Sequence, residues 1–321
     1  MLFTGKLRQQ PFPLVTRLVA VEAGAQGARG DIVAGRNSVV ALLGVAIVLF
    51  GLSWPVVKIA LTSTDIPPLL LACSRSGFAA IALLAVALLR GRLSVPSRDD
   101  LPALFGVGVL QLTVFFLLCH LAIKSVPASH TAILSNAAII WVVPLSALIG
   151  RPEPHGKWLA ALLALGGIVI IVQPWWIDVA TPQSLFGYGM LLVAALAWAG
   201  TIVLARNFPS RMEASGLLLW SFGLSFVLLF VAAAASGTSL NFPAASLGYA
   251  LFNGALVAPL GTYCLFALSK KLAPKSAAIS FLAIPICGVL VSCVVLGEPI
   301  DTSLIVGSLL IFGGIIVASR C

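Results

Sequence analysis

The sequence has few charged residues for its length. Only 9% of its 321 residues are Asp, Glu, Lys or Arg, while 60% are hydrophobic. A water-soluble fold of this length does not have the core volume to bury so much apolar surface. In a bilayer the apolar surface faces hydrocarbon instead, so the composition predicts an all-α membrane protein.

Among the charged residues, the acidic ones are fewer than the basic ones. The chain has 10 Asp and Glu against 19 Lys and Arg, a net charge of +9, and no predicted membrane helix carries an acidic residue near its middle. This argues against the carboxylate relay of many proton- or sodium-driven pumps and favours a facilitator, an exchanger or a His-linked antiporter. The cations flank apolar runs, which indicates topology signals and lipid headgroup contacts, with no nucleic-acid partner.

Motifs for covalent and metal chemistry are also missing. The six cysteines form no CxxC pair, and there is no HExxH, GxSxG, Walker A or metal-spaced His cluster. The sequence therefore predicts no disulfide framework, no metal or cofactor, and no enzymatic activity.

Long apolar runs dominate what remains. A spanning helix needs about 20 apolar residues, and ten such runs are separated by Pro-, Gly- and charge-rich breaks. The predicted helices are 39–62, 68–89, 101–123, 128–149, 157–173, 186–205, 214–235, 246–269, 275–296 and 303–319.

The first 37 residues have a different composition. They hold no long apolar run and no cleavage site after a hydrophobic core, which predicts a disordered basic cytoplasmic tail rather than a signal peptide. A short surface helix over 12–21 and a start codon placed too far upstream are alternatives.

The distribution of Lys and Arg predicts the orientation. With a cytoplasmic N-terminus, the inner segments after the tail carry eleven Lys and Arg and the outer loops carry only Lys124. Because cytoplasmic loops are enriched in these residues, both termini are expected in the cytoplasm of a bacterium, with 174–185 as a periplasmic linker.

The two halves of the chain resemble each other at an offset of 147 residues. Pro127 aligns with Pro274, and Gly166-Gly167 aligns with Gly313-Gly314. The repeats, 38–173 and 186–319, each contain five predicted helices, and an odd number requires that they be inverted in the membrane, as in many transporters. Arg151 then aligns with Glu298, so the cation lies only on the inner side.

These features together resemble the EamA-type branch of the drug/metabolite transporter superfamily. The similarity covers about 38–319 and rests on three motifs. The first is an aromatic-small pair that opens each repeat, with a basic residue eight positions later. The second is a Pro-Pro and Arg-aromatic pattern, and the third is a Pro, Gly-Glu, Gly-Gly series. These residues are Phe50-Gly51 with Lys58, Trp198-Ala199 with Arg206, Pro67-Pro68 with Arg75 and Phe78, and Pro285, Gly297-Glu298 and Gly313-Gly314.

The chain departs from the family pattern in its first repeat. Phe50 replaces the usual Trp, Arg151 replaces the usual Glu, and Ala138 stands where the second repeat has Pro285. The resemblance implies that helices one to four and six to nine surround a central cavity, with helices five and ten peripheral. It also implies export or exchange of small metabolites.

Two cations lie within predicted helices and need a partner, since an intramembrane charge costs about 2.5–3.5 kcal/mol at a helix centre. Lys58 either snorkels to the outer headgroups or faces the cavity and attracts an anionic group of the substrate. Arg75 either hydrogen-bonds a neighbouring helix or binds a carboxylate or phosphate. Asp65 is a possible ion-pair partner for both.

His120 and His130 flank the outer turn between the third and fourth helices and are candidates for proton coupling, or else simple interfacial polar groups.

The remaining candidates are polar or aromatic residues within the helices. They either fix a substrate or join and pack helices. The full set of predicted substrate-binding residues is Trp54, Lys58, Arg75, Gln111, Asn136, Trp141, Trp198, Asn253, Tyr263 and Ser280. Pro55, Pro144, Pro259 and Pro285 are predicted hinges or kinks, with Pro144 and Pro285 kinking the fourth and ninth helices.

The sequence thus predicts an inner-membrane secondary transporter for small metabolites, a monomer or weak homodimer in contact with lipid. A flippase for a lipid-linked substrate, a membrane-embedded enzyme and a structural subunit are the alternatives. A flippase predicts a groove open to lipid with cations at its mouth, an enzyme predicts a nucleophile beside a base, and a structural subunit predicts no convergence of polar residues.

Overall fold

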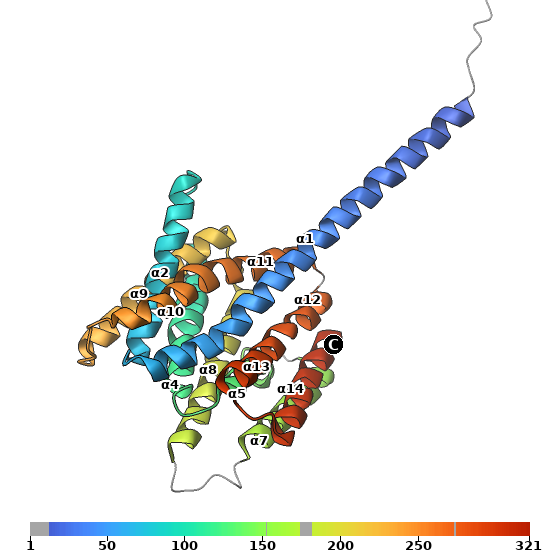
Figure 1. The fold of residues 1–321 in the computed structure, drawn as a ribbon. Helices are drawn as coiled ribbons and strands as arrows, with labels where there is room; N and C mark the ends of the chain where they lie inside the picture. The colour runs from blue at the N-terminus through green and yellow to red at the C-terminus, as the bar shows by residue number, and fades with distance from the viewer. Residues whose placement is uncertain (1–12, 152, 174–181, 273) are drawn as a thin grey trace, which may run out of the picture. The chain divides into compact units, whose positions relative to one another are not determined.

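The computed structural model describes residues 13–151, 153–173, 182–272 and 274–321. The chain divides into two compact units, Met1–Leu42 and Leu43–Cys321, and the second holds the features described below. The described residues are mostly helical and contain no strand, and they include ten helical stretches long and apolar enough to cross a membrane. The predicted fold class, an all-α membrane protein with ten spans, is confirmed (Figure 1).

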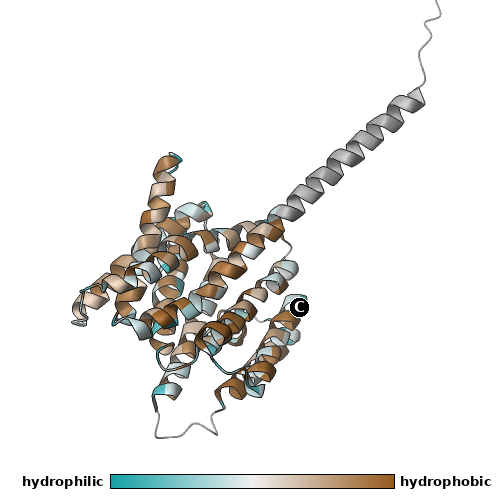
Figure 2. Cartoon of the chain, in the orientation of Figure 1, coloured by the Kyte–Doolittle hydropathy of each residue, from teal (hydrophilic) through white to brown (hydrophobic). Residues whose placement is uncertain are grey.

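Six spans are single helices, numbered here by their order among the ten. They are span 1 in α1 (Pro13–Ser63), span 2 in α2 (Pro68–Leu89), span 5 in α7 (His155–Val172), span 6 in α8 (Pro182–Asn207), span 7 in α9 (Ala214–Ala235) and span 10 in α14 (Thr302–Arg320). Hydrophobic residues dominate these helices, and hydrophilic residues gather near their ends (Figure 2). Residues 13–37, expected to be disordered, form the first part of α1, and residues 1–12 lie outside the described part of the chain.

Spans 3 and 8 are built from several pieces with a wide π-helix in the centre. Span 3 consists of η1 (Arg98–Asp100), α3 (Leu101–Leu104), η2 (Phe105–Phe115) and α4 (Phe116–Ala122). Span 8 consists of η3 (Ala244–Ser246), α10 (Leu247–Leu251), η4 (Phe252–Gly261) and α11 (Thr262–Lys271). The π-helices η2 and η4 begin 147 residues apart, the same offset as the sequence repeat. In η2 the Thr113 hydroxyl also donates to the carbonyl of Gly108, five residues back, at 2.8 Å.

Spans 4 and 9 are each interrupted, and again at related positions. Span 4 consists of α5 (Ala128–Leu134) and α6 (Ile139–Leu148), and span 9 of α12 (Pro274–Phe281) and α13 (Ala283–Leu296). The break at Leu282 precedes Pro285, whose ring disfavours a continuous helix. Pro144 lies inside α6 without a break there, so the interruption of span 4 falls ahead of the proline expected to kink it.

Side-chain hydrogen bonds account for the break in span 4. The Asn136 amide donates to the carbonyl of Ala132 at 2.8 Å, and the Ser135 hydroxyl donates to the same carbonyl at 3.4 Å. Short polar side chains that bond backbone carbonyls compete with the regular helical pattern. Asn136 and Ser135 thus interrupt the helix of span 4, as Pro285 interrupts the helix of span 9.

Spans 5 and 10, the last span of each repeat, pack closely through glycine. A Cβ atom on Gly167 would lie 2.5 Å from the carbonyl oxygen of Gly307, and one on Gly314 would lie 2.6 Å from that of Ala160. Gly166 and Gly313 have open space beside them. One glycine of each predicted pair therefore permits the helices to approach, which is the role of small residues at membrane interfaces.

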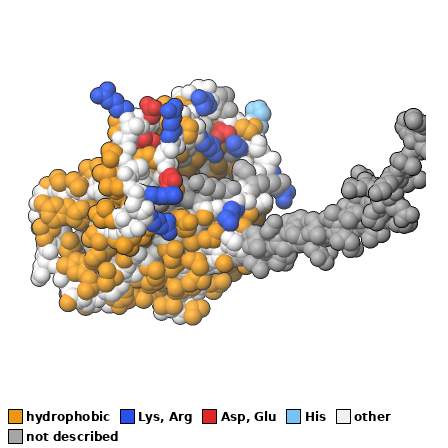
Figure 3. Space-filling view, turned by 90° about the horizontal axis from the view of Figure 1, so that it is seen from above, with side chains coloured by type: hydrophobic (Ala, Val, Ile, Leu, Met, Phe, Trp, Pro, Cys, Tyr) orange, Lys and Arg blue, Asp and Glu red, His pale blue; other side chains and the backbone are white. Residues whose placement is uncertain are grey.

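One face of the unit is rich in basic side chains. Figure 3 shows the face that carries the loops after α2 and α8, where Lys and Arg side chains gather and outnumber Asp and Glu, above flanks that are mostly hydrophobic. The assignment of this face to the cytoplasm stays a prediction. The inverted arrangement of the repeats stays a prediction.

Candidate functional site

A cavity of about 290 Å³ lies among spans 1, 3, 4, 6, 7, 8 and 9, so both halves of the chain contribute to its wall. Its lining consists of aromatic and aliphatic side chains with a few neutral polar groups, and it includes no charged residue. The lining residues are Phe50, Ser53, Trp54, Val107, Gln111, Leu112, Phe115, Phe116, Ser135, Asn136, Trp198, Leu218, Thr262, Leu265, Phe281 and Ile284. An apolar pocket with a few placed polar groups is the usual form of a small-molecule site.

Helical spacing explains how the aromatic wall forms. Phe50 and Trp54 are four residues apart on span 1, and Gln111 and Phe115 are four apart on span 3, so each pair lies on one face of its helix. Trp198 of span 6 packs against Phe115 with ring centroids 5.3 Å apart. The predicted residues Trp54, Gln111 and Trp198 all line the cavity.

The interruption of span 4 contributes its own polar groups to the wall. Ser135 and Asn136 line the cavity at the point where the helix is broken. Irregular backbone is tolerated at membrane depth where it borders a cavity or is buried in protein. The predicted residue Asn136 therefore both shapes the break and faces the site.

Ser53 is held in place from outside the cavity. Its hydroxyl donates to the Asn253 Oδ1 atom at 2.6 Å, and Asn253, which is 1% exposed, donates in turn to the carbonyl of Tyr249 at 3.3 Å. The predicted residue Asn253 thus joins span 8 to span 1 behind the wall, and it does not line the cavity.

A groove of about 440 Å³ lies beside the cavity and is lined by residues of spans 4, 5, 6, 9 and 10. It shares Asn136, Trp198 and Phe281 with the cavity, so the two hollows adjoin at these side chains. Lys157 and Arg206 also line the groove.

One half-buried carboxylate, Glu153, pairs with both of these cations. Arg206 Nη1 lies 2.9 Å from Glu153 Oε1, and Lys157 contacts the other Glu153 oxygen. Burial acts to raise the pKa of Glu153, but the hydrogen bonds and charges of Lys157 and Arg206 outweigh it and hold that pKa below its usual value.

At the opposite ends of the spans, two charged residues hold the turn between spans 3 and 4. Lys58 donates to the carbonyl oxygens of Ile123 and Val126, the latter at 3.0 Å. Glu298 accepts hydrogen bonds from the first backbone N–H groups of α5. Lys58 is therefore engaged by the turn between spans 3 and 4 and does not line the cavity.

Arg75 lies directly behind the cavity wall. Its side chain is 2% exposed, and its Cζ atom lies 3.5 Å from the ring centroid of Phe116, a cavity-lining residue. The Arg75 Nη1 atom has no hydrogen-bond partner among the described residues. The cation–π contact is its clearest stabilising interaction.

The two predicted proton-coupling histidines occupy different surroundings. His120 is buried beside Phe116, and its Nδ1 atom has no hydrogen-bond partner among the described residues. His130 Nδ1 lies 2.7 Å from the hydroxyl of Tyr188. Neither histidine lines the cavity, and their role in proton coupling stays a prediction.

Several other predicted site residues lie away from the cavity. Trp141 donates from Nε1 to the carbonyl of Leu192 at 3.0 Å, which joins span 4 to span 6. Tyr263 is 50% exposed on the outer side of α11, where its neighbour Thr262 faces the cavity instead. Ser280 is also outside the lining, next to Phe281, and Pro55 and Pro259 lie inside α1 and η4 without interrupting either element.

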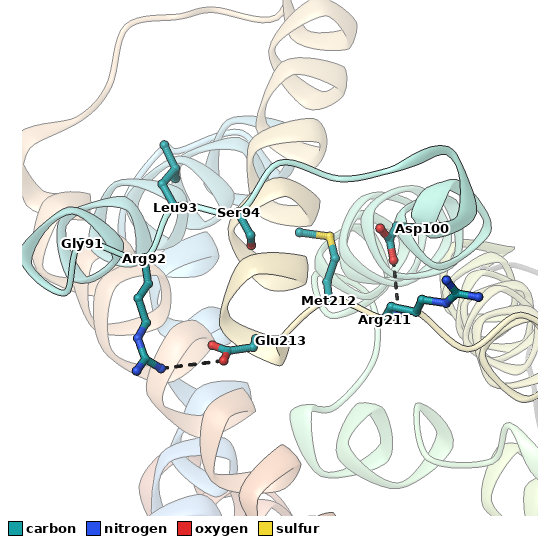
Figure 4. Close-up of a pocket in the computed structure, with 8 residues that line it drawn as sticks. All are labelled: Gly91, Arg92, Leu93, Ser94, Asp100, Arg211, Met212 and Glu213. Atoms are coloured by element: carbon teal, nitrogen blue, oxygen red, sulfur yellow. Dashed lines mark hydrogen bonds and ion pairs between the residues drawn. The ribbon is translucent and has the colours of Figure 1, made fainter.

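A separate hollow of about 500 Å³ lies among the loops after α2 and α8 (Figure 4). Asp100 accepts hydrogen bonds there from the Ser210 hydroxyl at 2.6 Å and from the Arg211 backbone at 3.1 Å, and Arg92 lies 3.8 Å from Glu213. Arg92 and Glu213 thus form an ion pair, Asp100 is held by hydrogen bonds, and these contacts join the two loops.

Sequence reasoning missed much of the wall. Phe115, Phe116, Thr262 and Phe281 line the cavity without having been predicted. The spacing of Gln111 and Phe115 was a usable signal, but the π-helices change which side chains share a face, and no simple pattern predicts them. The described residues contain no cluster of His, Cys, Asp and Glu that could hold a metal ion.

Comparison with known proteins points to one family. The model of the EamA-like transporter family matches residues 37–173 and 185–320. An uncharacterized transporter of Archaeoglobus fulgidus is 22% identical over 87% of this chain and 98% of its own length. The uncharacterized transporter YvbV of Bacillus subtilis is 26% identical over 84% of this chain and 88% of its own length.

Two further comparisons agree. The uncharacterized inner membrane transporter YedA of Escherichia coli is 26% identical over 66% of this chain and 68% of its own length. A solved crystal structure, titled only as that of a protein, superposes with a TM-score of 0.60 at 19% identity and covers 87% of this chain and 98% of that one. At this identity the structural likeness concerns the fold alone.

Proposed function

Because the chain belongs to the EamA-like transporter family, we propose that it is a secondary transporter of the bacterial inner membrane that exports or exchanges small polar or amphipathic metabolites by alternating access. The observation that carries this proposal is the central cavity, whose wall comes from spans of both halves. Two similar halves around one site are the arrangement that rocking mechanisms require. The relative YedA, named as an inner membrane transporter, supports the location.

The two ends of the site differ in how open they are, as expected for one conformation of an alternating-access cycle. At the Glu298 end, Lys58 and Glu298 hold the turn between spans 3 and 4 by bonds to its backbone. At the Arg206 end, a groove adjoins the cavity. With both termini in the cytoplasm, the described conformation is closed to the periplasm and approached from the cytoplasm.

The lining sets limits on the substrate. Aromatic rings from Phe50, Trp54 and Trp198 accept an apolar or planar body, while Gln111 and Asn136 offer both hydrogen-bond donors and acceptors. No carboxylate faces the cavity to attract a cation. The wall also lacks a base beside its hydroxyl groups, which argues against an enzyme.

Solute flux in proteoliposomes tests the proposal. Vesicles that contain the full chain are loaded with a metabolite mixture, and saturable efflux or counterflow of at least one solute is expected. Asn136→Ala is expected to reduce that flux, whereas Tyr263→Phe, at an exposed position outside the lining, keeps it. If the folded protein shows no saturable flux of any solute, the proposal is contradicted.

A flippase for a lipid-linked substrate is the second candidate. The groove beside span 6 has Lys157 and Arg206 among its lining residues, as a site for an anionic headgroup does. Both cations are already paired with Glu153, which favours the metabolite transporter. Transbilayer movement of a fluorescent lipid-linked phosphate in the same vesicles separates the two functions.

A further inference from the structure

Two cations, Lys58 and Arg75, lie inside described spans rather than at the last residues of a span, and they differ in how their donors are used. Lys58 donates to the carbonyls of Ile123 and Val126. Arg75 is buried to a similar or greater depth, yet its Nη1 atom lacks a partner among the described residues. A buried, unsatisfied charged group is costly and therefore needs an explanation.

No carboxylate of the described structure compensates Arg75. The ion pairs found among the described residues involve Glu153, Glu213 and Asp99, which lie at the ends of the spans with other basic partners. Arg75 contacts aromatic faces instead, with Phe116 at 3.5 Å and Phe222 at 6.0 Å from its Cζ atom. The positive charge inside the bundle is thus stabilised by rings and not by a counter-ion.

A single side chain separates this charge from the cavity. Phe116 lines the cavity and has Arg75 against its face. Phe116 is also the first residue of α4, directly after the π-helix η2, so its ring stands at a change in helix type. π-Helical segments are often found at functional sites. The ring of Phe116 thus stands between the guanidinium and the cavity.

We propose that Arg75 is the anion-recognition residue of this transporter and that Phe116 covers it when the site is empty. The proposal rests on the transport function inferred above and names the substrate class: small molecules with a carboxylate, or another compact anionic group, on an apolar or aromatic body. The anion takes the unused Nη1 donor, and the body occupies the aromatic part of the cavity. Guanidinium donors suit carboxylates because their bonds are charge-assisted and often bidentate.

Three probes of matched size test this assignment. Phenylacetate, phenylacetamide and phenethylamine share one aromatic body and differ in head-group charge at neutral pH. Their binding to the purified full-length chain is measured by calorimetry in detergent. The acid is expected to bind about tenfold more tightly than the amide, and the amine more weakly than both.

Variants then assign the preference to Arg75. Arg75→Gln is expected to bring the acid-to-amide affinity ratio close to one while amide binding persists, and Arg75→Lys is expected to keep part of the preference. Phe116→Leu uncovers the guanidinium and raises the ratio. Lys124→Gln removes the same charge from an exposed loop residue and is expected to leave the ratio unchanged.

The outcomes separate this inference from the transport function. Equal binding of acid and amide by the unmodified chain, or an unchanged ratio in Arg75→Gln, overturns the assignment while flux in proteoliposomes still stands. Absence of binding by all three probes overturns it as well. Loss of all solute flux in vesicles refutes the transporter itself, whatever the affinity ratio.

Discussion

Glu298 accepts hydrogen bonds from the backbone N–H groups of Ser129 at 2.8 Å and of the preceding Ala128 at 2.6 Å, 169 and 170 residues away in the chain. The carboxylate thus stabilises the N-terminus of α5 from the loop after span 9. Free N–H groups and the helix dipole both favour a negative charge there. This contact joins the two halves at the Glu298 end of the spans.

Glu298→Gln is expected to loosen that end. The amide has one acceptor oxygen and no charge, so the free energy of unfolding should fall by about 1–2 kcal/mol. A cysteine placed at Ser135, in a background without the six native cysteines, should react faster with a membrane-impermeant maleimide added on the Glu298 side. Glu213→Gln, at a carboxylate 71% exposed, is the control. Unchanged stability and unchanged labelling contradict a closing role for Glu298.

Acidification is expected to weaken the contact of Glu153 with Lys157 and Arg206. The folded-state pKa of Glu153 is lowered, so its stabilising contribution is complete above the ordinary carboxyl value of about 4.3 and is lost as pH falls through the lower folded-state value. Thermal unfolding in detergent over this range should show Glu153→Gln less stable than the unmodified chain near neutral pH, with the difference shrinking in acid. A difference independent of pH contradicts the assignment.

The glycines between spans 5 and 10 provide a matched comparison. Gly167→Ala and Gly314→Ala place a Cβ atom against backbone carbonyl oxygens and should destabilise the protein by more than about 1 kcal/mol. Gly166→Ala and Gly313→Ala meet open space, so they should be neutral or stabilising, since alanine favours helices by about 1 kcal/mol over glycine. Thermal unfolding of the four single variants checks the order; equal effects within each pair refute it.

The Ser53–Asn253 hydrogen bond should show coupling. Ser53→Ala leaves the buried Asn253 Oδ1 atom without its donor and should cost about 1–3 kcal/mol of stability, whereas Asn253→Leu in the Ser53→Ala background should cost less than it does alone. A double-mutant cycle measured by unfolding gives the interaction energy. Additive effects contradict a direct bond.

Replacing Ser135 and Asn136 together by alanine removes both side-chain bonds to the Ala132 carbonyl. We expect a more regular span 4, slower amide exchange around residues 135–138, and lower solute flux because two polar cavity groups are lost. The double substitution Ser63→Ala and Thr62→Ala, which removes hydroxyls at the exposed end of α1, is the control. Normal flux with a regular helix shows that the break is dispensable.

The sequence predicted the number and extent of the spans closely, because hydrophobic length in a bilayer is a strong constraint. Ser38–Ser63 was predicted as 39–62, and Pro68–Leu89 matches 68–89. Prediction of the cavity wall was weaker. Trp54, Gln111, Asn136 and Trp198 line it as expected.

The other candidates show why residue type alone is insufficient. Lys58 and Tyr263 were both predicted to bind substrate, yet one binds a turn and the other is exposed. The sequence also indicated a kink at Pro144, while Asn136 and Ser135 form the break by bonding a carbonyl four or three residues back. Such competition depends on rotamers, and propensities do not encode them.

The paired π-helices η2 and η4 have a consequence for motion in hydrocarbon. A broken backbone hydrogen bond has no water to replace it in hydrocarbon. A membrane helix that bends must therefore keep its backbone groups hydrogen-bonded throughout the movement. A π-helix can do this because its i→i+5 hydrogen bonds can be exchanged one at a time for i→i+4 bonds. Each exchange shifts the extra residue of the π-helix along the chain and rotates the side chains that follow it. Each half has one such π-helix, starting at Phe105 and at Phe252. Spans 3 and 8 can therefore rotate past their neighbours without losing backbone hydrogen bonds.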